Sequence, residues 1–191
     1  MTGSNVNGKE PPKIQFVEAY LRWWIRPGSR VLDLGCGASV YRRVVDSEFV
    51  GLDITRKEYR PGVPRRVDVV ASAACIPVAD HTIDLVFSVG TLFVMREHFA
   101  ILREAWRVLR PGGRLVLFDY NRRTQTKLQA TVDYALPRWT QWGLANLVRS
   151  AGFASVHRWS NVVVSSPTPQ TWHRALLQEL FGTWIVVSGI K

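Results

Sequence analysis

A short pattern near the start of the chain combines an acidic residue with two glycines. Asp33, Gly35 and Gly37 stand at alternate positions within residues 31–40. The apolar residues around them predict a buried strand of a parallel sheet that runs into a tight turn. Glycines let the backbone bend there and let a ligand approach more closely than a Cβ would permit. The Asp33 carboxylate could hold a cationic amino group, and backbone N–H groups at the start of the next helix would face the ligand.

Two classes of nucleotide cofactor bind at such turns, and the residue types discriminate between them. A dinucleotide fingerprint requires a third glycine, in the pattern G-x-G-x-x-G, but Val40 occupies that position. The Asp33 carboxylate would also repel a pyrophosphate. A cofactor with an ammonium and a sulfonium group therefore fits better than one with two phosphates. A tight turn of some other α/β protein, without a ligand, is the alternative.

A second acidic residue follows the next predicted strand, residues 49–52. Asp53 lies 18 residues after Gly35 (53 minus 35), near the spacing of about 20 at which nucleotide-binding α/β folds place a ribose-binding carboxylate. We expect Asp53 to accept hydrogen bonds from both ribose hydroxyls and Ile54 to pack on an adenine face. This residue does not separate S-adenosylmethionine from NAD. It does argue against NADP, whose additional phosphate it would repel.

The elements that must position these residues alternate between strands and helices. The alternation of apolar runs with helical patterns predicts an α/β fold with a mostly parallel sheet. We expect the last strand to form an antiparallel hairpin with the strand before it and to close the sheet. Strands are expected at 30–34, 49–52, 67–70, 83–88, 115–118, 155–164 and 183–188, and helices at 13–26, 40–46, 98–109, 140–150 and 172–180.

Residues 31–119 together resemble the class I S-adenosylmethionine-dependent methyltransferases. The D-x-G-x-G turn resembles the first motif of that family. The run E-A-W-R-V-L-R-P-G-G-R-L-V-L, which begins at Glu104, resembles the helix, turn and fifth strand of its small-molecule methyltransferases. The resemblance implies a Rossmann-like seven-stranded, mostly parallel sheet with helices on both faces and an antiparallel last strand. It also implies S-adenosyl-L-methionine as the cofactor.

The resemblance places cofactor contacts along the first four strands. The family usually carries an acidic residue where this chain has Ser72; such an acid would accept the adenine amine, and a serine hydroxyl accepts more weakly. Residues 88–91 lack the Asn/Asp-Pro-Pro-Tyr motif of methyltransferases that act on base or amide nitrogens, which disfavours those acceptors. The expected cofactor-binding residues are Asp33, Gly35, Cys36, Gly37, Asp53, Ile54, Ser72, Ala73 and Ser88.

The sequence does not assign a catalytic residue. Methyl transfer from a sulfonium depends largely on positioning, and a general base is needed only when the acceptor must lose a proton. His98, Asp119 and Tyr120 are available near the expected ligand-binding edge, but none has a recognisable partner. His81 and Asp84 fall at the start of a strand, opposite the edge at which open α/β sheets bind ligands, so we expect them to be structural.

The chain as a whole has 191 residues and a formal net charge of +10. Its length suits one domain, expected at 13–191 after a polar tail at 1–12. Residues 56–66 form the densest basic region, which we expect to be a solvated loop at the sheet edge. No apolar run reaches the roughly 20 residues of a membrane span. The two cysteines, Cys36 and Cys75, lack metal or redox spacing, which predicts no metal and a reduced, cytoplasmic setting.

These patterns predict a methyltransferase that acts on a small molecule. The basic segments and the tryptophans favour an anionic or aromatic acceptor. Three alternatives stay open. One is a protein that binds S-adenosylmethionine without transferring the methyl group. Another is an RNA-directed methyltransferase, which the charge alone permits. The third is a nucleotide-linked oxidoreductase, disfavoured by Asp33 and the missing third glycine. The acceptor atom and the oligomeric state are not readable from the sequence.

Overall fold

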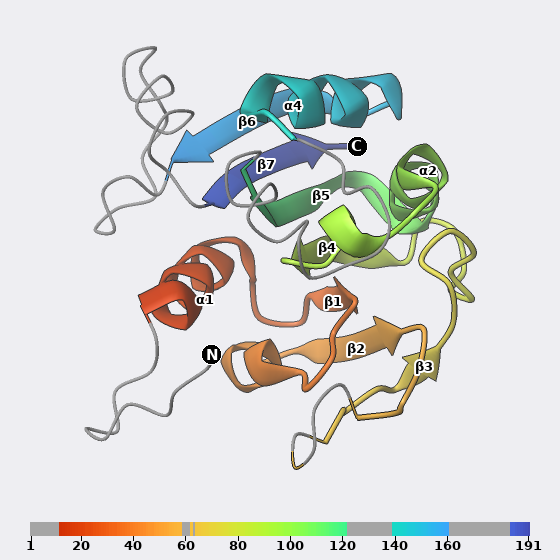
Figure 1. The fold of residues 1–191 in the computed structure, drawn as a ribbon. Coiled ribbons are helices and arrows are strands. Elements are labelled where there is room, and N and C mark those ends of the chain that lie inside the picture. The colour runs from red at the N-terminus through yellow and green to blue at the C-terminus, as the bar shows by residue number, and fades with distance from the viewer. Residues whose placement is uncertain (1–11, 59–61, 63, 122–138, 161–183) are drawn as a thin grey trace.

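One seven-stranded sheet forms the centre of the molecule (Figure 1). The computed structural model describes residues 12–58, 62, 64–121, 139–160 and 184–191. The strand order across the sheet is β3-β2-β1-β4-β5-β7-β6. The strands are β1 (Arg30–Leu34), β2 (Glu48–Asp53), β3 (Val69–Val70), β4 (Ile83–Val89), β5 (Leu109–Tyr120), β6 (Ala154–Ser160) and β7 (Trp184–Ile190).

The pairing of the strands confirms the predicted mixed sheet. β1 to β5 pair in parallel, whereas β7 runs antiparallel to both β5 and β6. The last strand does not close the sheet at its edge, because β7 inserts between β5 and β6. The parallel strands therefore end at one common edge, where β1 lies between β2 and β4.

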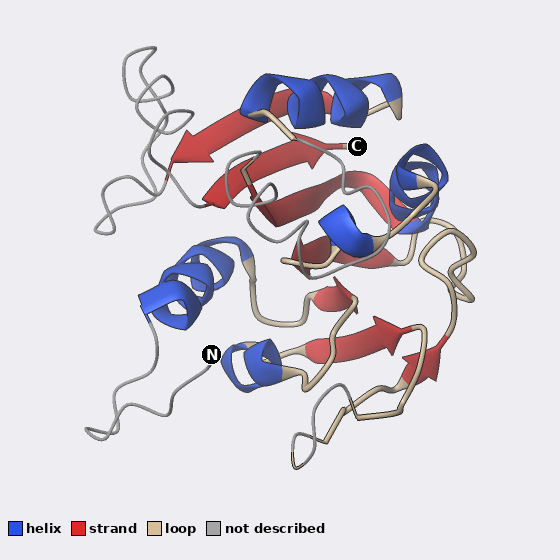
Figure 2. Ribbon diagram, viewed as in Figure 1, coloured by secondary structure: helices blue, strands red, loops and turns tan. Residues whose placement is uncertain are grey.

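Helices cover both faces of the sheet (Figure 2). Successive residues of a strand point to opposite faces: Val31 packs in one apolar cluster, with α1 (Pro12–Trp24) and the 3-10 turn η1 (Val40–Val44). Leu32 packs in the other, with α2 (His98–Val108) and α4 (Gln141–Ser150). Because both faces are covered, four consecutive residues of β1, residues 31–34, are buried, and three of them are apolar.

The largest difference from the predicted elements follows the glycine turn. The helix expected at 40–46 is the short 3-10 turn η1. Ser39 precedes it with a left-handed φ of 53°, and Val45 leaves it in an extended conformation. Three of the residues at 40–45 are valines, whose β-branched side chains disfavour a longer helix.

Other elements differ in length rather than in kind. β3 is confined to Val69–Val70, and α1 ends at Trp24. β5 includes the Pro-Gly-Gly turn that was expected to precede it, because Gly112 donates to the carbonyl of Lys191 (3.0 Å) and Gly113 accepts from its N–H (3.0 Å). The expected helix at 172–180, the end of the strand at 161–164 and the basic segment at 122–137 lie outside the described residues.

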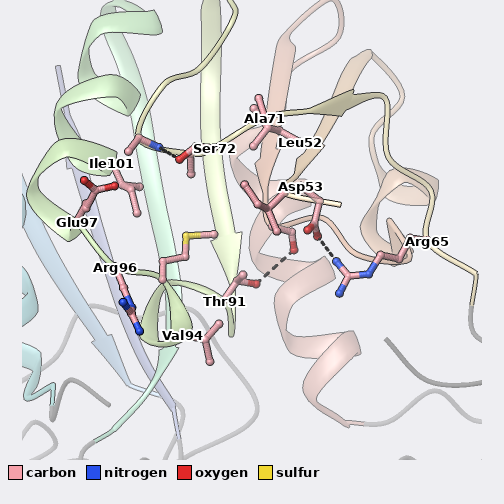
Figure 3. A pocket seen from close by; sticks show the side chains of 15 residues that line it. Leu52, Asp53, Arg65, Ala71, Ser72, Thr91, Val94, Arg96, Glu97 and Ile101 are labelled. Atoms are coloured by element: carbon pink, nitrogen blue, oxygen red, sulfur yellow. Dashed lines mark hydrogen bonds and ion pairs between the residues drawn. The ribbon is translucent and has the colours of Figure 1, made fainter. Parts of the chain in front are cut away.

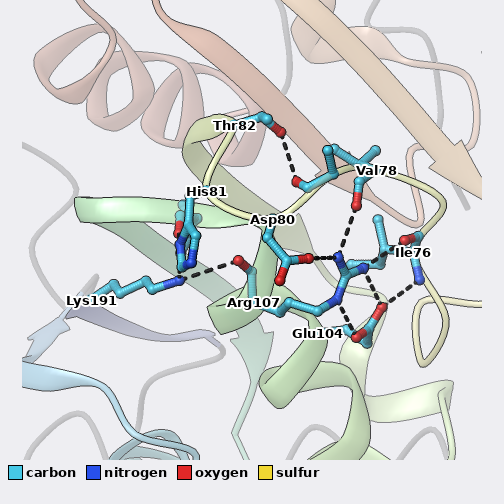
Figure 4. Close-up of polar contacts among 10 residues, drawn as sticks. Ile76, Val78, Asp80, His81, Thr82, Glu104, Arg107 and Lys191 are labelled. Atoms are coloured by element: carbon cyan, nitrogen blue, oxygen red, sulfur yellow. Dashed lines mark hydrogen bonds and ion pairs between the residues drawn. The ribbon is translucent and has the colours of Figure 1, made fainter.

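Arg107 of α2 fixes the loop between β3 and β4 (Figure 4). Its guanidinium donates to the carbonyls of Ile76 (2.8 Å) and Val78 (2.9 Å) and pairs with Glu104 (2.7 Å) and Asp80. Glu104 also accepts the N–H of Ile76 at 2.8 Å. These bonds hold the loop whose first residues line the site described below.

The two residues expected to be structural lie at the amino edge of the sheet. Asp84 accepts the N–H of Arg30 at 2.6 Å and pairs with Arg110 at 2.6 Å. His81 Nδ1 lies 2.8 Å from the ammonium of Lys191. Both placements confirm that these side chains stabilise the fold and stand far from the ligand-binding edge.

Candidate functional site

A pocket of about 510 Å³ opens at the carboxyl ends of the parallel strands (Figure 3). One wall comes from the ends of β1 and β2, another from the loop after β3, and a third from the segment that joins η2 (Leu92–Val94) to α2. Its polar side chains are Asp53, Arg65, Ser72, Thr91, Arg96 and Glu97, and its apolar surface includes Leu52, Ile54, Ala71, Ala73, Val94, Met95 and Ile101.

Asp33 lies in β1 behind this pocket, two residues before the pocket-lining Gly35. Its side chain is buried, and within the described part of the chain Oδ2 has no hydrogen-bond partner. Burial, reinforced by the nearby Asp53 carboxylate, raises the pKa of Asp33 well above its usual range. A buried carboxyl without a donor is unfavourable. A cationic group placed against it would remove that cost and favour the ionised form.

The glycine turn is closely packed against its neighbours. Gly35 has a φ of 75°, and a Cβ there would come 2.2 Å from Cγ2 of Thr91. The N–H groups of Gly35 and Cys36 donate to the carbonyl of Leu52 (2.8 and 3.1 Å). These two N–H groups are therefore used within the fold, where they join the turn to the end of β2.

Asp53 and Arg65 form an ion pair of 2.7 Å in the pocket, and only 8% and 17% of their side-chain surfaces are exposed. Asp53 Oδ2 also accepts the N–H of Gly37 at 3.0 Å. The expectation of a solvated basic loop is thus wrong for Arg65. Asp53 does not present two unoccupied oxygens to a ribose, since Oδ2 already receives two donors. Oδ1 has no hydrogen bond from any residue that the structure describes.

The nine expected cofactor residues separate into two groups. Gly35, Asp53, Ile54, Ser72 and Ala73 line the pocket, and the side chain of Ile54 is 68% exposed there. The hydroxyl of Ser72 accepts the N–H of Ala74 at 3.2 Å.

The other four, Asp33, Cys36, Gly37 and Ser88, are not among the residues that line the pocket. The Ser88 hydroxyl is buried and donates to the carbonyl of Leu34 (2.9 Å), which joins β4 to β1. The Cys36 thiol contacts the carbonyl of Arg66 (3.5 Å), and burial raises its pKa to about 12.

Several residues that line the pocket were not predicted from the sequence. Thr91, Arg96 and Glu97 line it from the segment between β4 and α2, and Arg65 lines it from the opposite side. The position of residues 88–91 at the ligand-binding end of a strand was a signal for Thr91. No local pattern marks Glu97, whose φ of 53° becomes visible only in the structure.

The three candidate bases do not line this pocket. His98 Nε2 lies 3.1 Å from the carbonyl of Leu92, and burial lowers the pKa of its imidazole. Asp119 is fully buried and accepts the N–H of Tyr120 at 2.8 Å; burial raises its pKa to about 8, so it is mostly protonated at neutral pH. The Tyr120 ring packs on that of Trp184, with 4.1 Å between centroids.

The described residues contain no group of three or more His, Cys, Asp or Glu side chains arranged to hold a metal ion. Among their helices, none combines the length and the apolar character needed to cross a membrane.

Comparison with known sequences identifies relatives of this chain. Residues 32–117 match the model of a methyltransferase domain family. A demethylmenaquinone methyltransferase of Mycobacterium sp. (strain KMS) is 33% identical over 168 residues, which cover 72% of this chain and 73% of that protein. The 27-O-demethylrifamycin SV methyltransferase of Amycolatopsis mediterranei is 35% identical over 109 residues, covering 50% of this chain and 40% of its own. This chain thus spans less than half of that relative.

Solved structures share the fold. An S-adenosylmethionine-dependent methyltransferase from Mesorhizobium loti has a TM-score of 0.65 at 19% identity, with 91% of this chain and 96% of that chain covered. The seven-stranded sheet, the pocket at its carboxyl edge and the sequence match over most of the mycobacterial relative agree with one another. The chain therefore belongs to the S-adenosylmethionine-dependent methyltransferase family.

Proposed function

We propose that this protein binds S-adenosyl-L-methionine in the described pocket and transfers its methyl group to a small-molecule acceptor. The buried Asp33 carboxyl carries the proposal, because it lacks a donor and lies directly behind the glycine turn. A cationic amino acid end of a ligand satisfies this group, whereas a pyrophosphate would be repelled. The pocket beyond the turn offers an apolar slot and the Asp53 carboxylate, which suit an adenosine.

Each residue has a distinct part in this arrangement. When bound, the cofactor supplies an electrophilic methyl group on a sulfonium, so the protein's task is chiefly to orient the reactants and exclude water. Asp33 would hold the amino group. Asp53, oriented by Arg65 and by the N–H of Gly37, would accept ribose hydroxyls through Oδ1. Gly35 has no side chain to obstruct the ligand, and Ile54 would cover the adenine.

The acceptor is proposed to be an aromatic small molecule of the quinol type. A relative aligned over 84% of this chain is named as a 2-methyl-6-phytyl-1,4-hydroquinone methyltransferase, and two relatives aligned over 72% are named as demethylmenaquinone methyltransferases. The aromatic side chains of Phe93, Tyr120 and Trp184 also gather near the carboxyl ends of β4 and β5. An apolar ring packs favourably against such side chains.

Ligand binding tests the cofactor assignment directly. Thermal unfolding would be followed with S-adenosylmethionine, S-adenosylhomocysteine and NAD in parallel, because a ligand of the native state raises its apparent stability. Both sulfur compounds are expected to raise the unfolding temperature, and NAD is not. Calorimetric titration of Asp53→Ala should then show substantially weaker binding. The absence of any shift with the sulfur compounds at millimolar concentration would refute the assignment.

Turnover separates an enzyme from a protein that only binds the cofactor. Purified protein would be supplied with S-adenosylmethionine and a panel of reduced quinones, phenols and phosphorylated amines. Formation of S-adenosylhomocysteine that depends on a quinol supports the proposed acceptor class. Binding without turnover on any acceptor would favour the non-catalytic alternative, and retention of generic RNA in a gel-shift at physiological salt would favour the RNA-directed one.

A further inference from the structure

We infer that Glu97 recognises the exocyclic amine of the adenine at the far end of this pocket. The inference rests on the proposed function, because it assumes a ligand that contains adenosine. An adenine amine presents hydrogen-bond donors that need an acceptor when the ring is enclosed. An acceptor in the pocket must therefore remain available to the amine.

The other side chains of the pocket that could accept from an amine already make hydrogen bonds or ion pairs within the fold. Asp53 Oδ2 receives Arg65 and Gly37. The Ser72 hydroxyl accepts the N–H of Ala74 at 3.2 Å. The Thr91 hydroxyl is directed to the carbonyls of Gly35 (3.3 Å) and Val89 (3.2 Å).

Glu97 differs from these three. Its side chain lines the pocket, yet the structure gives its carboxylate no hydrogen bond or ion pair with any described residue. A carboxylate has two oxygens that accept and none that donates, which matches an amine. With Oδ1 of Asp53 assigned to the ribose, Glu97 is the pocket acid whose two oxygens remain for the base.

The backbone at Glu97 supports a role beyond folding. Glu97 is the N-cap of α2, but its side chain makes no capping hydrogen bond, and its φ and ψ of 53° and 38° are left-handed. Ser, Thr, Asp and Asn cap helices better than Glu, and Gly and Asn adopt this conformation at lower cost. Strained residues of this kind are often found at ligand clamps. Glutamate at this position therefore does not favour the start of the helix, but its carboxylate suits ligand binding in the pocket.

The two ends of the pocket match the two ends of an adenosine. Asp53 and Arg65 lie on one side, and Glu97 and Ile101 lie on the opposite side (Figure 3). Apolar surface from Leu52, Ala73 and Met95 contributes to the lining. A ribose held by Asp53 would therefore direct the base across an apolar slot, with its amine toward Glu97.

The test compares two ligands that differ only in that amine. S-adenosylhomocysteine and its analogue with hydrogen in place of the exocyclic amine would be titrated calorimetrically into wild type, Glu97→Ala and Glu97→Gln. Glu97→Ala should bind S-adenosylhomocysteine about three- to tenfold more weakly and bind the analogue unchanged. Glu97→Gln should lose less, because its amide oxygen still accepts. Glu48→Ala, an exposed acid on β2 outside the pocket, serves as the matched control and should change neither affinity.

The outcomes separate this inference from the proposed function. Failure of wild type to bind S-adenosylhomocysteine refutes the function and the inference with it. If wild type binds but Glu97→Ala affects both ligands equally or neither, the inference alone is wrong. Loss of the preference for the amine in Ser72→Ala, and not in Glu97→Ala, would assign the amine to Ser72 and also overturn it.

A further variant, Glu97→Gly, distinguishes a role of Glu97 in stability from a role in binding. Glu97→Gly should raise the thermal midpoint of the unliganded protein, because glycine adopts the left-handed conformation without strain, yet it should weaken binding of S-adenosylhomocysteine as Glu97→Ala does. A merely structural residue would move stability and affinity in the same direction, and that result would contradict the assignment.

Discussion

The two edges of the sheet differ in how completely their charged side chains are paired: the carboxyl edge has the Asp53–Arg65 ion pair but also carries acids without a partner among the described residues. At the amino edge, Arg107 pairs with Glu104 and Asp80, and Arg110 pairs with Asp84. At the carboxyl edge, Asp33 has an oxygen without a donor, and Glu97 makes no described bond while it holds a left-handed backbone.

This contrast shows where the protein stabilises itself and where it is prepared for a ligand. Unsatisfied or strained groups reduce the stability of the unliganded fold, and they persist where binding compensates them. Paired charges at the amino edge have no such need. Substitutions at the carboxyl edge should therefore change affinity more than stability, and substitutions at the amino edge should do the reverse.

Asp33→Asn should have the largest effect on cofactor affinity and tests the difference between the two edges most directly. Removing the charge opposite the cofactor's amino group should weaken binding of S-adenosylhomocysteine about 10- to 100-fold. The unliganded fold should be no less stable at pH 8, since a buried carboxyl without a donor is replaced by a neutral amide. Calorimetric titration and urea unfolding measure the two quantities. A loss of stability with unchanged affinity would reverse the roles that we assign to the two edges.

Arg107→Met should give the opposite pattern. The substitution removes bonds to the carbonyls of Ile76 and Val78 and leaves Glu104 without its partner, so we expect a loss of about 2 kcal/mol in the free energy of unfolding. The affinity of the folded protein for S-adenosylhomocysteine should change by less than about twofold, on the order of 0.4 kcal/mol. A large loss of affinity would show that this network positions the pocket loop as well as stabilising it.

Asp119→Asn tests whether the buried acid near the carboxyl end of β5 is a structural group. Its pKa of about 8 in the folded protein lies above the value of about 4 in an unfolded chain. The stability it contributes is therefore complete below pH 4 and is lost as the pH rises through about 8. Relative to wild type, the variant should gain stability as the pH rises from about 4 to about 8, by up to about 1.4 kcal/mol per pH unit. Equal pH dependence of urea unfolding in both proteins would contradict this.

Arg110→Ala should have the smallest effect. The Arg110 side chain is 60% exposed where it pairs with Asp84, and exposed ion pairs contribute about 0–1 kcal/mol. We expect unfolding to change within that range and binding to remain the same. A loss as large as that of Arg107→Met would indicate that the amino edge acts as one cooperative network.

The predictions that agree with the structure depend on local or regularly spaced signals. Gly35 requires a positive φ, Asp53 ends a strand at a characteristic spacing, and the alternation of apolar runs indicates the parallel sheet. The wrong predictions concern contacts across the fold. Arg65 was expected in solvent because its neighbours are polar and basic, whereas it folds back onto Asp53. The prediction of a helix at 40–46 is wrong for a local reason, because Ser39 is left-handed and valines follow it.

The sequence by itself determined the class of fold and the chemistry of the turn, because strand hydrophobicity, glycine conformation and the charge of Asp33 are properties of neighbouring residues. The tertiary structure decided which distant residues meet. Thr91 bonds to the carbonyl of Gly35 across 56 positions of the chain because β4 pairs beside β1. In the same way, the segment after β4 brings Glu97 to a pocket that begins at Asp53 of β2. Strand order, which no local pattern encodes, creates that proximity.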